Sequence, residues 1–220
     1  QVSALQPLAG EPAPGLTSEQ LQRFWAGRNA YVTPIVEEEG LGPIFNKASC
    51  AACHDAPIGG AGAVTVVNFA IAQGPNFDPL HEQGGPVLQV ASIHSDCTET
   101  LPAGVNLIRP RITLGTLGFG YIEAIPDEDI IAYAAESQVD GVTGRPHMVT
   151  TLAHQDDPDL PLRVGRFGWK AQIATILHFS ADAAHNEVGL TSPFFPDDNV
   201  ANDLPGADGS CDTIPDPEIP

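Results

Sequence analysis

Apolar positions change their spacing along the chain, and the first regular stretch follows Thr17. Three apolar side chains share one helical face there: Leu21, Phe24 and Trp25. Gln20 stands three residues after Thr17, which is the spacing of a capping box. The pattern therefore predicts a helix from Thr17 to about Tyr31, preceded by an extended lead-in over residues 1–16, which are rich in Pro and Gly.

Periodicity is weaker in the middle of the chain and returns near the end. Residues 55–105 carry many glycines and no helical period, so we expect loops with one short strand at Ala63–Phe69. Acidic residues in the first turn favour a short helix over Asp127–Ser137. A last helix is predicted from about Lys170 to Glu187 by four apolar positions: Ile173, Ile176, Leu177 and Ala184.

Composition adds a loop-rich character to this picture. The chain has 220 residues, of which 22 are Gly and 21 are Pro. So many helix and strand breakers favour short elements joined by irregular loops. We therefore expect a mainly α fold with long irregular loops and little β structure.

Charge narrows the range of partners. The chain carries 28 acidic and 9 basic residues, a formal net charge of −19. Non-specific binding to nucleic acid is not expected, because phosphate would be repelled. Such a surface suits a basic redox partner, although it also serves plain solubility. No apolar run approaches the ~20 residues of a membrane helix, so no membrane span is predicted.

The chemistry is concentrated in one motif, Cys50-Ala51-Ala52-Cys53-His54. C-x-x-C-H is the signature of covalent haem c attachment. On one turn, Cys50 and Cys53 reach two vinyl groups of one haem, and His54 binds the iron as proximal ligand. One covalent haem c is therefore predicted.

Three other interpretations of the motif compete with haem attachment. A zinc site would need further thiolates or a His pair at zinc-ligand spacing. A thioredoxin-type redox pair would need a strand before the motif and a helix after it. A chance occurrence is the third. The His directly after the second Cys favours haem over all three.

Cys97 and Cys211 form a spare pair. In an oxidising compartment they would close a disulfide loop, contributing up to ~4–5 kcal/mol by chain-entropy reasoning. Two unrelated buried thiols are the alternative. The opening residues, Gln1-Val2-Ser3-Ala4, suit a chain whose signal peptide has been removed. We expect a periplasmic or otherwise extracytoplasmic protein.

Several stretches in one order resemble the di-haem oxidoreductase (putative peroxidase) family of c-type cytochromes, distant relatives of bacterial di-haem cytochrome c peroxidases. Besides the C-x-x-C-H motif they are Gly40–Asn46, Gly84–Gln89, Leu117–Pro126, Gly144–Pro146, Gly165–Ala171, Gly189–Pro193 and Pro215–Ile219. The resemblance covers most of the chain from Gly40 onward. It implies a cytochrome-c-like fold, so that residues 17–220 would form a single c-type haem domain.

The resemblance also implies what stands beside this domain. Family members usually carry a second C-x-x-C-H, and this sequence has one. We therefore expect the N-terminal haem half of a di-haem, peroxidase-like oxidoreductase, either a fragment or a natural half. Its partner would be a redox protein or a second haem-bearing chain or domain. Whether the chain is an enzyme by itself stays open, because such peroxidases use two haems.

The distal side of the iron has several candidate ligands, and none is singled out: His81, His94, His147, Met148, His178 and His185. His147 follows Gly144-Arg145-Pro146, and related cytochromes have an Arg- and Pro-containing loop near the haem. His178 is flanked by apolar residues on the last predicted helix. We therefore place the distal ligand at His147 or His178. Each is, as the alternative, an ordinary hydrogen-bonded His.

Four further residues carry hypotheses of their own. By similarity to the segment that supplies an acid in di-haem peroxidases, Glu187 is the catalytic acid candidate; a solvated helix end is the alternative. Arg145 and Arg166 suit haem propionates or, equally, structural ion pairs. Trp169 could contact the haem or lie between redox centres, but we prefer a core tryptophan between glycines.

The leading hypothesis is extracytoplasmic redox work by one haem domain of a di-haem, peroxidase-like oxidoreductase. The alternative is a single-haem electron-transfer cytochrome or a relay subunit without a substrate of its own.

Overall fold

The computed structural model describes residues 8–136, 141–151, 162–199, 211–212 and 214–220. The first half of the predicted lead-in, residues 1–7, lies outside the described residues. By internal contacts the chain divides into two units. Unit 1 comprises residues 1–117 and 184–220, and unit 2 comprises residues 118–183.

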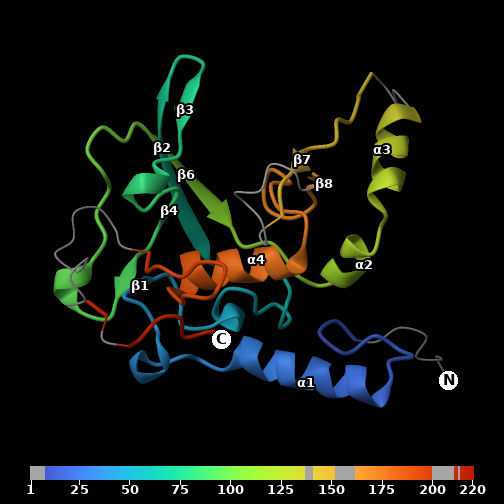
Figure 1. Ribbon diagram of the computed structural model, residues 1–220, viewed down its shortest axis with the longest axis horizontal. Helices are drawn as coiled ribbons and strands as arrows, with labels where there is room; N and C mark the ends of the chain where they lie inside the picture. The colour runs from blue at the N-terminus through green and yellow to red at the C-terminus, as the bar shows by residue number, and fades with distance from the viewer. Residues whose placement is uncertain (1–7, 137–140, 152–161, 200–210, 213) are drawn as a thin grey trace. The chain divides into compact units, whose positions relative to one another are not determined.

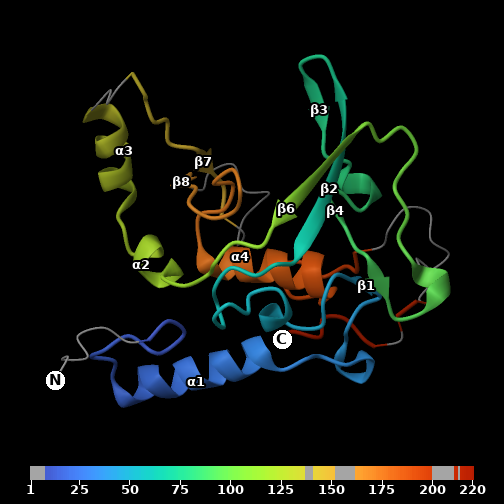
Figure 2. The same ribbon diagram turned by 180° about the vertical axis from the view of Figure 1, so that it is seen from behind.

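In unit 1, the predicted first helix is confirmed as α1, Ser18–Val32. Both capping-box hydrogen bonds form between Thr17 and Gln20, at 2.9 and 3.2 Å. No residue of α1 is buried, and Trp25 is 44 % exposed. The end of α1 lies against a 3₁₀ turn over Cys50–Ala52, and both views show this turn in cyan beside the helix (Figure 1, Figure 2).

A small antiparallel sheet forms the centre of unit 1. The long strand β2, Thr65–Gln73, pairs with β3, Asn76–Asp78, with β4, Val87–Leu88, and with β6, Leu107–Ile112 (Figure 1). A second, two-stranded sheet joins β1, Ile44–Phe45, to β5, Ala91–Ser92. Phe69 on β2 and Ile44 on β1 are each 1 % exposed, so both sheets contribute to the core.

Unit 2 contains the other three α-helices of the described residues. They are α2, Phe119–Glu123, α3, Asp127–Glu136, and α4, Ile176–Ala183, with a short pair β7, Met148–Val149, and β8, Arg163–Val164. Three rings pack together at its core, with Phe119 4.8 Å from Phe167 and 5.7 Å from Phe179 between ring centroids. The helix predicted over Asp127–Ser137 is confirmed as α3, which ends at Glu136.

The expected mainly α fold is wrong. The described residues hold eight strands in several small antiparallel sheets beside four α-helices, so the architecture is mixed. The strand expected at Ala63–Phe69 is longer, and β6 was missed. Residues 107–112 have no clean alternation of apolar and polar side chains, and they include Pro110, a residue that argues against a strand. Pro110 nevertheless lies within β6, opposite Val67 of β2.

The last helix is also shorter than predicted. Residues from Lys170 to Ile173 form a loop, because a bridge pairs Phe167 with Ile173 and Ala171 has a positive φ of 49°. The α-helix begins at Ile176 and passes into a π-turn over Ala184–Val188. None of the described helices combines the length and apolarity that crossing a membrane requires.

Candidate haem-attachment site

The C-x-x-C-H motif folds as one tight turn. The Ser49 hydroxyl caps it by accepting a hydrogen bond from the backbone N–H of Ala52, at 3.3 Å. The backbone N–H groups of Cys53 and His54 both donate to the carbonyl oxygen of Cys50, at 3.1 and 3.0 Å. Both thiols and the imidazole therefore project from a single turn, as covalent haem attachment requires.

The four cysteines separate into two classes. Cys97 and Cys211 form a disulfide with a Cα–Cα distance of 5.8 Å. Cys50 and Cys53 stay free thiols, the first exposed and the second buried. The two motif thiols are thus kept apart from the structural pair and are available for another bond.

His54 lies in a small aromatic and polar niche. Its ring is 6.2 Å from the ring of Tyr31, whose hydroxyl lies 3.1 Å from the Thr116 hydroxyl. Burial lowers the pKa of His54, partly offset by the nearby carbonyl groups of Leu114 and Gly60. A neutral imidazole is the form that binds a metal. The Nδ1 atom is buried and makes no well-formed hydrogen bond to the described residues.

These observations fit a covalently bound haem. The motif supplies two free thiols and a neutral imidazole on one turn. Leu114, whose backbone lies beside His54, and Leu117, whose backbone N–H donates to the Gly59 carbonyl oxygen, are 47 % and 43 % exposed. Large apolar side chains left partly uncovered around such a turn are what a haem ring would cover.

Glu187 lies in the same unit as the motif, on the π-turn. Its carboxylate Oε2 accepts a hydrogen bond from the side-chain amide of Asn46, at 2.7 Å. The pKa of the Cys53 thiol is raised mainly by burial and next by the negative charge of Glu187, while Lys47 opposes the shift. Glu187 is therefore close enough to act electrostatically on the motif.

The two preferred distal candidates belong to the other unit. The Nδ1 atom of His147 lies 3.1 Å from the Lys170 carbonyl oxygen, and the exposed ring lines a cavity of about 470 Å³. His178 on α4 is 8 % exposed, burial lowers its pKa, and its Nδ1 atom has no hydrogen-bond partner in the part of the chain that the structure describes. Met148 stands on β7, 40 % exposed. Distal ligation by His147 or His178 stays a prediction.

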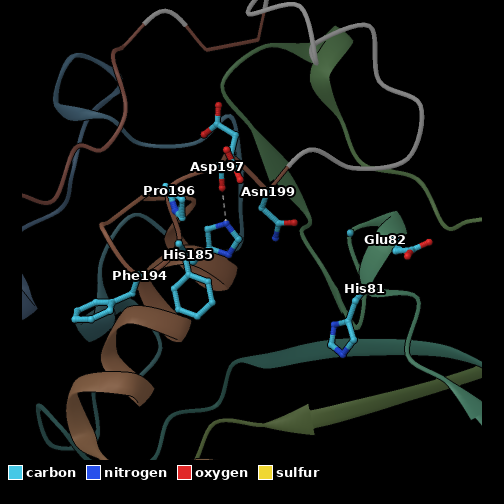
Figure 3. Close-up of a pocket in the computed structure, with 10 residues that line it drawn as sticks. His81, Glu82, His185, Phe194, Pro196, Asp197 and Asn199 are labelled. Carbon is cyan, nitrogen blue, oxygen red and sulfur yellow. Dashed lines mark hydrogen bonds between the residues drawn. The ribbon is translucent and has the colours of Figure 1, made fainter. Parts of the chain in front are cut away.

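The other described histidine candidates have local partners in unit 1. His94 lies 3.7 Å from the carboxylate of Glu37 at the surface. His81 and His185 line a separate pocket of about 320 Å³ (Figure 3). There the His185 ring stacks on Phe195 at 5.1 Å, and its Nε2 atom lies 3.0 Å from the Asp197 carbonyl oxygen.

Arg166 has a structural role, so of the two interpretations the ion pair is confirmed. Its side chain is 2 % exposed and pairs with Asp127, which also binds Arg163 at 2.8 Å. Its Nη1 donates to three carbonyl oxygens around the end of α2: Ile122, Glu123 and Ile125. The pKa of Asp127 is lowered to about 2, mainly by the hydrogen bond from Arg163 and further by the Val164 N–H and the two guanidinium charges. Arg145 is exposed.

Trp169 does not belong to the core. Its side chain is 48 % exposed, so the preference for a buried tryptophan between glycines is wrong.

The sequence also resembles known proteins over a defined range. Residues 92–206, just over half of the chain, match the family described as di-haem oxidoreductase, putative peroxidase. The chain belongs to the di-haem oxidoreductase family. Neither the curated proteins nor the solved structures contain a match. The family match begins at Ser92, so the C-x-x-C-H turn lies before it and its role rests on its own geometry.

A buried polar cluster in unit 1 was not recognised from the sequence. Asn46, Gln89 and Glu99 are 5 %, 1 % and 6 % exposed. The Glu99 carboxylate accepts from the backbone N–H of Gln89 at 2.5 Å, and the Gln89 side chain donates to the carbonyl oxygen of Asn186. Asn46 and Gln89 lie in stretches that carry the family resemblance, which was the signal that could have found them.

Four carboxylates of the C-terminal region also come together: Asp198, Asp212, Asp216 and Glu218. Burial, reinforced by the three neighbouring carboxylates, raises the pKa of Asp198 to about 7. The Thr191 hydroxyl lies 2.8 Å from Asp216 and 2.6 Å from Glu218, so the cluster ties the C-terminal segment to Thr191.

Proposed function

We propose that this chain is an extracytoplasmic haem domain of a di-haem, peroxidase-like oxidoreductase. The observation that carries the proposal is the turn at Cys50–His54. It presents two free thiols and a neutral imidazole together, although the same chain closes its other two cysteines into a disulfide. Membership of the di-haem oxidoreductase family supplies the reaction class.

In this proposal, each motif residue has one task. Cys50 and Cys53 bind the haem through thioether bonds, and His54 is the axial ligand on the proximal side. When bound, the haem supplies one-electron redox chemistry. Tyr31 packs against the His54 ring and limits how far it rotates, since the Tyr31 hydroxyl is itself held by Thr116.

Glu187 is the proposed acid. Its carboxylate is held by Asn46, near the motif, and a carboxylate can carry the proton that peroxide reduction consumes. The distal position is proposed for His147 or His178, which leaves two functions open to the haem. A strong sixth ligand makes an electron carrier, and an accessible iron makes a site for an oxidant.

Location and partner complete the proposal. The disulfide between Cys97 and Cys211 favours an oxidising compartment such as the periplasm. The partner is a redox protein or a second haem-bearing chain or domain, as the family's two-haem architecture suggests.

Absorption spectroscopy tests the proposal directly. Protein made in a host that attaches c-type haem should show a c-type spectrum that survives denaturation, one haem per chain. Cys50→Ser and Cys53→Ser should each weaken covalent retention, whereas the control Cys97→Ser/Cys211→Ser should keep it. A wild-type protein without haem absorbance would refute the proposal.

Carbon monoxide separates the two functions. A reduced spectrum that shifts with carbon monoxide indicates an accessible iron and supports the peroxidase-like role. A spectrum that carbon monoxide leaves unchanged indicates two strong axial ligands and favours the electron carrier. In that case, His147→Ala and His178→Ala identify the ligand by which variant gains the carbon monoxide shift.

A further inference from the structure

Several backbone hydrogen bonds fix the turn that carries Glu187. The backbone N–H groups of Asn46 and Lys47 both donate to the Glu187 carbonyl oxygen, at 2.8 and 3.2 Å. The N–H of Gly42 donates to the carbonyl oxygen of Val188 at 3.3 Å. These bonds attach the π-turn that carries Glu187 to the residues on either side of β1. The last of these residues, Lys47, stands three positions before Cys50.

Close packing reinforces this attachment. Gly189 has a positive φ of 78°, and a Cβ there would stand 2.5 Å from the carbonyl oxygen of Ile44. No side chain fits, so the two backbones meet directly. A π-turn is a rare local structure that is frequent at functional sites, and here it lengthens the turn that presents Glu187.

The side chain of Glu187 is held as firmly as its backbone. The Asn46 amide donates to Oε2 at 2.7 Å, and Asn46 is only 5 % exposed. The amide oxygen of Asn46 accepts from the backbone N–H of Val90 at 3.2 Å, which orients the amide so that its N–H₂ faces Glu187. Gln89 fixes the preceding residue by donating to the carbonyl oxygen of Asn186 at 2.8 Å.

We infer that Asn46 is a positioning residue that holds the Glu187 carboxylate next to the segment leading into the haem motif, so that its negative charge lowers the reduction potential of the attached haem. This inference rests on the proposed function. Haem reduction adds one electron and removes one positive charge from the iron. A fixed carboxylate nearby therefore stabilises the oxidised form, and more so inside the protein than in water.

The bonds to Glu187 place its charge close to the motif in the chain and in space. The Asn46 amide that holds the carboxylate belongs to the residue four positions before Cys50. The Glu187 carbonyl oxygen accepts a hydrogen bond from the N–H of Lys47, three positions before Cys50. The held carboxylate therefore lies beside the segment that leads directly into the predicted thioether residues.

The experiment is a redox titration of the haem-loaded protein and its variants at one pH. Glu187→Gln removes the charge but keeps an acceptor for Asn46. Its midpoint potential should rise above that of the wild type. Glu38→Gln is the matched control, since it removes the same charge from an exposed side chain of the same unit, and its potential should stay at the wild-type value.

Asn46 is tested by coupling. Asn46→Ala should raise the potential because the carboxylate is released, and Asn46→Ala/Glu187→Gln should match Glu187→Gln alone. Full additivity of the two shifts would overturn the inference, as would equal shifts in Glu187→Gln and Glu38→Gln.

Glu187→Asp keeps the test decisive where Asn46→Ala does not fold. It retains the charge, but its side chain is one methylene shorter and reaches less far toward Asn46. Its potential should lie between those of the wild type and Glu187→Gln, and a wild-type value would count against the need for a held carboxylate. Wild-type protein without covalent haem refutes the proposed function itself, whereas attached haem with unchanged potentials refutes this inference alone.

Discussion

Burial decides the pairing and the pKa of several charged residues in this protein more than their place in the sequence does. Arg166 illustrates this, since a cation suited to haem propionates is instead enclosed and paired with Asp127. Glu99 illustrates the opposite case, because its carboxyl group is buried and no cation pairs with it among the described residues. Desolvation raises the pKa of Glu99 to about 7, although the N–H of Gln89 partly opposes this.

Glu99→Gln therefore should change how stability depends on pH. The folded protein binds a proton at Glu99 that the unfolded chain has lost above the ordinary glutamate pKa of 4.5. Because the folded state binds this extra proton, the unfolding free energy of the wild type falls as the pH rises from 4.5 to about 7. As the pH rises across that window, the unfolding free energy of Glu99→Gln should increase relative to that of the wild type by on the order of 3 kcal/mol.

Urea unfolding at pH 5 and pH 8 measures this difference. Glu38→Gln serves as control, because Glu38 is exposed and its replacement should give a nearly constant offset. A Glu99→Gln offset that is equally constant would show that the carboxyl group is not held protonated.

At the scale of elements, the motif turn depends on a close backbone approach. A Cβ on Gly62 would lie 1.8 Å from the carbonyl oxygen of Cys53. Gly62→Ala should therefore displace the turn. The expected loss is several kcal/mol in unfolding free energy, on the scale of the largest single-site effects, together with poorer covalent haem retention.

Gly27→Ala on α1 is the control, because a Cβ at Gly27 would meet nothing within 4 Å. Its unfolding free energy should increase by roughly 0.5–1 kcal/mol. Urea unfolding and haem absorbance per chain measure both, and a Gly62→Ala protein with wild-type stability would contradict the tight approach.

Elements with a local signal were predictable, and elements fixed by distant partners were not. The capping box at Thr17 and the acidic first turn at Asp127 each mark a helix within a few residues. β6 has no such signal, since it is a strand because β2 lies beside it. The same holds at the site. C-x-x-C-H is visible in one line of sequence, whereas Asn46 and Glu187 meet across 141 positions.

For the whole molecule, the disulfide joins the C-terminal segment to the sheet region of unit 1. Cys97 and Cys211 are 114 positions apart. Removing the bond with Cys97→Ser/Cys211→Ser restores chain entropy to the unfolded state, at up to ~4–5 kcal/mol in unfolding free energy. Denaturant unfolding with and without reductant checks this, and a wild type insensitive to reductant would contradict it.

The net charge of −19 is also a property of the whole molecule, and it can affect how fast a charged redox partner associates. If the charge steers electron-transfer encounters, a basic redox protein should react quickly at low salt and at least tenfold more slowly near ~0.3 M salt, where screening is strong. An acidic redox protein of similar potential should show the reverse trend, because salt screens its repulsion. Stopped-flow reduction of the haem-loaded protein by each partner measures both rates, with a small neutral reductant as control. If neither protein partner shows a salt dependence beyond that control, the charge serves solubility and recognition resides in a local surface.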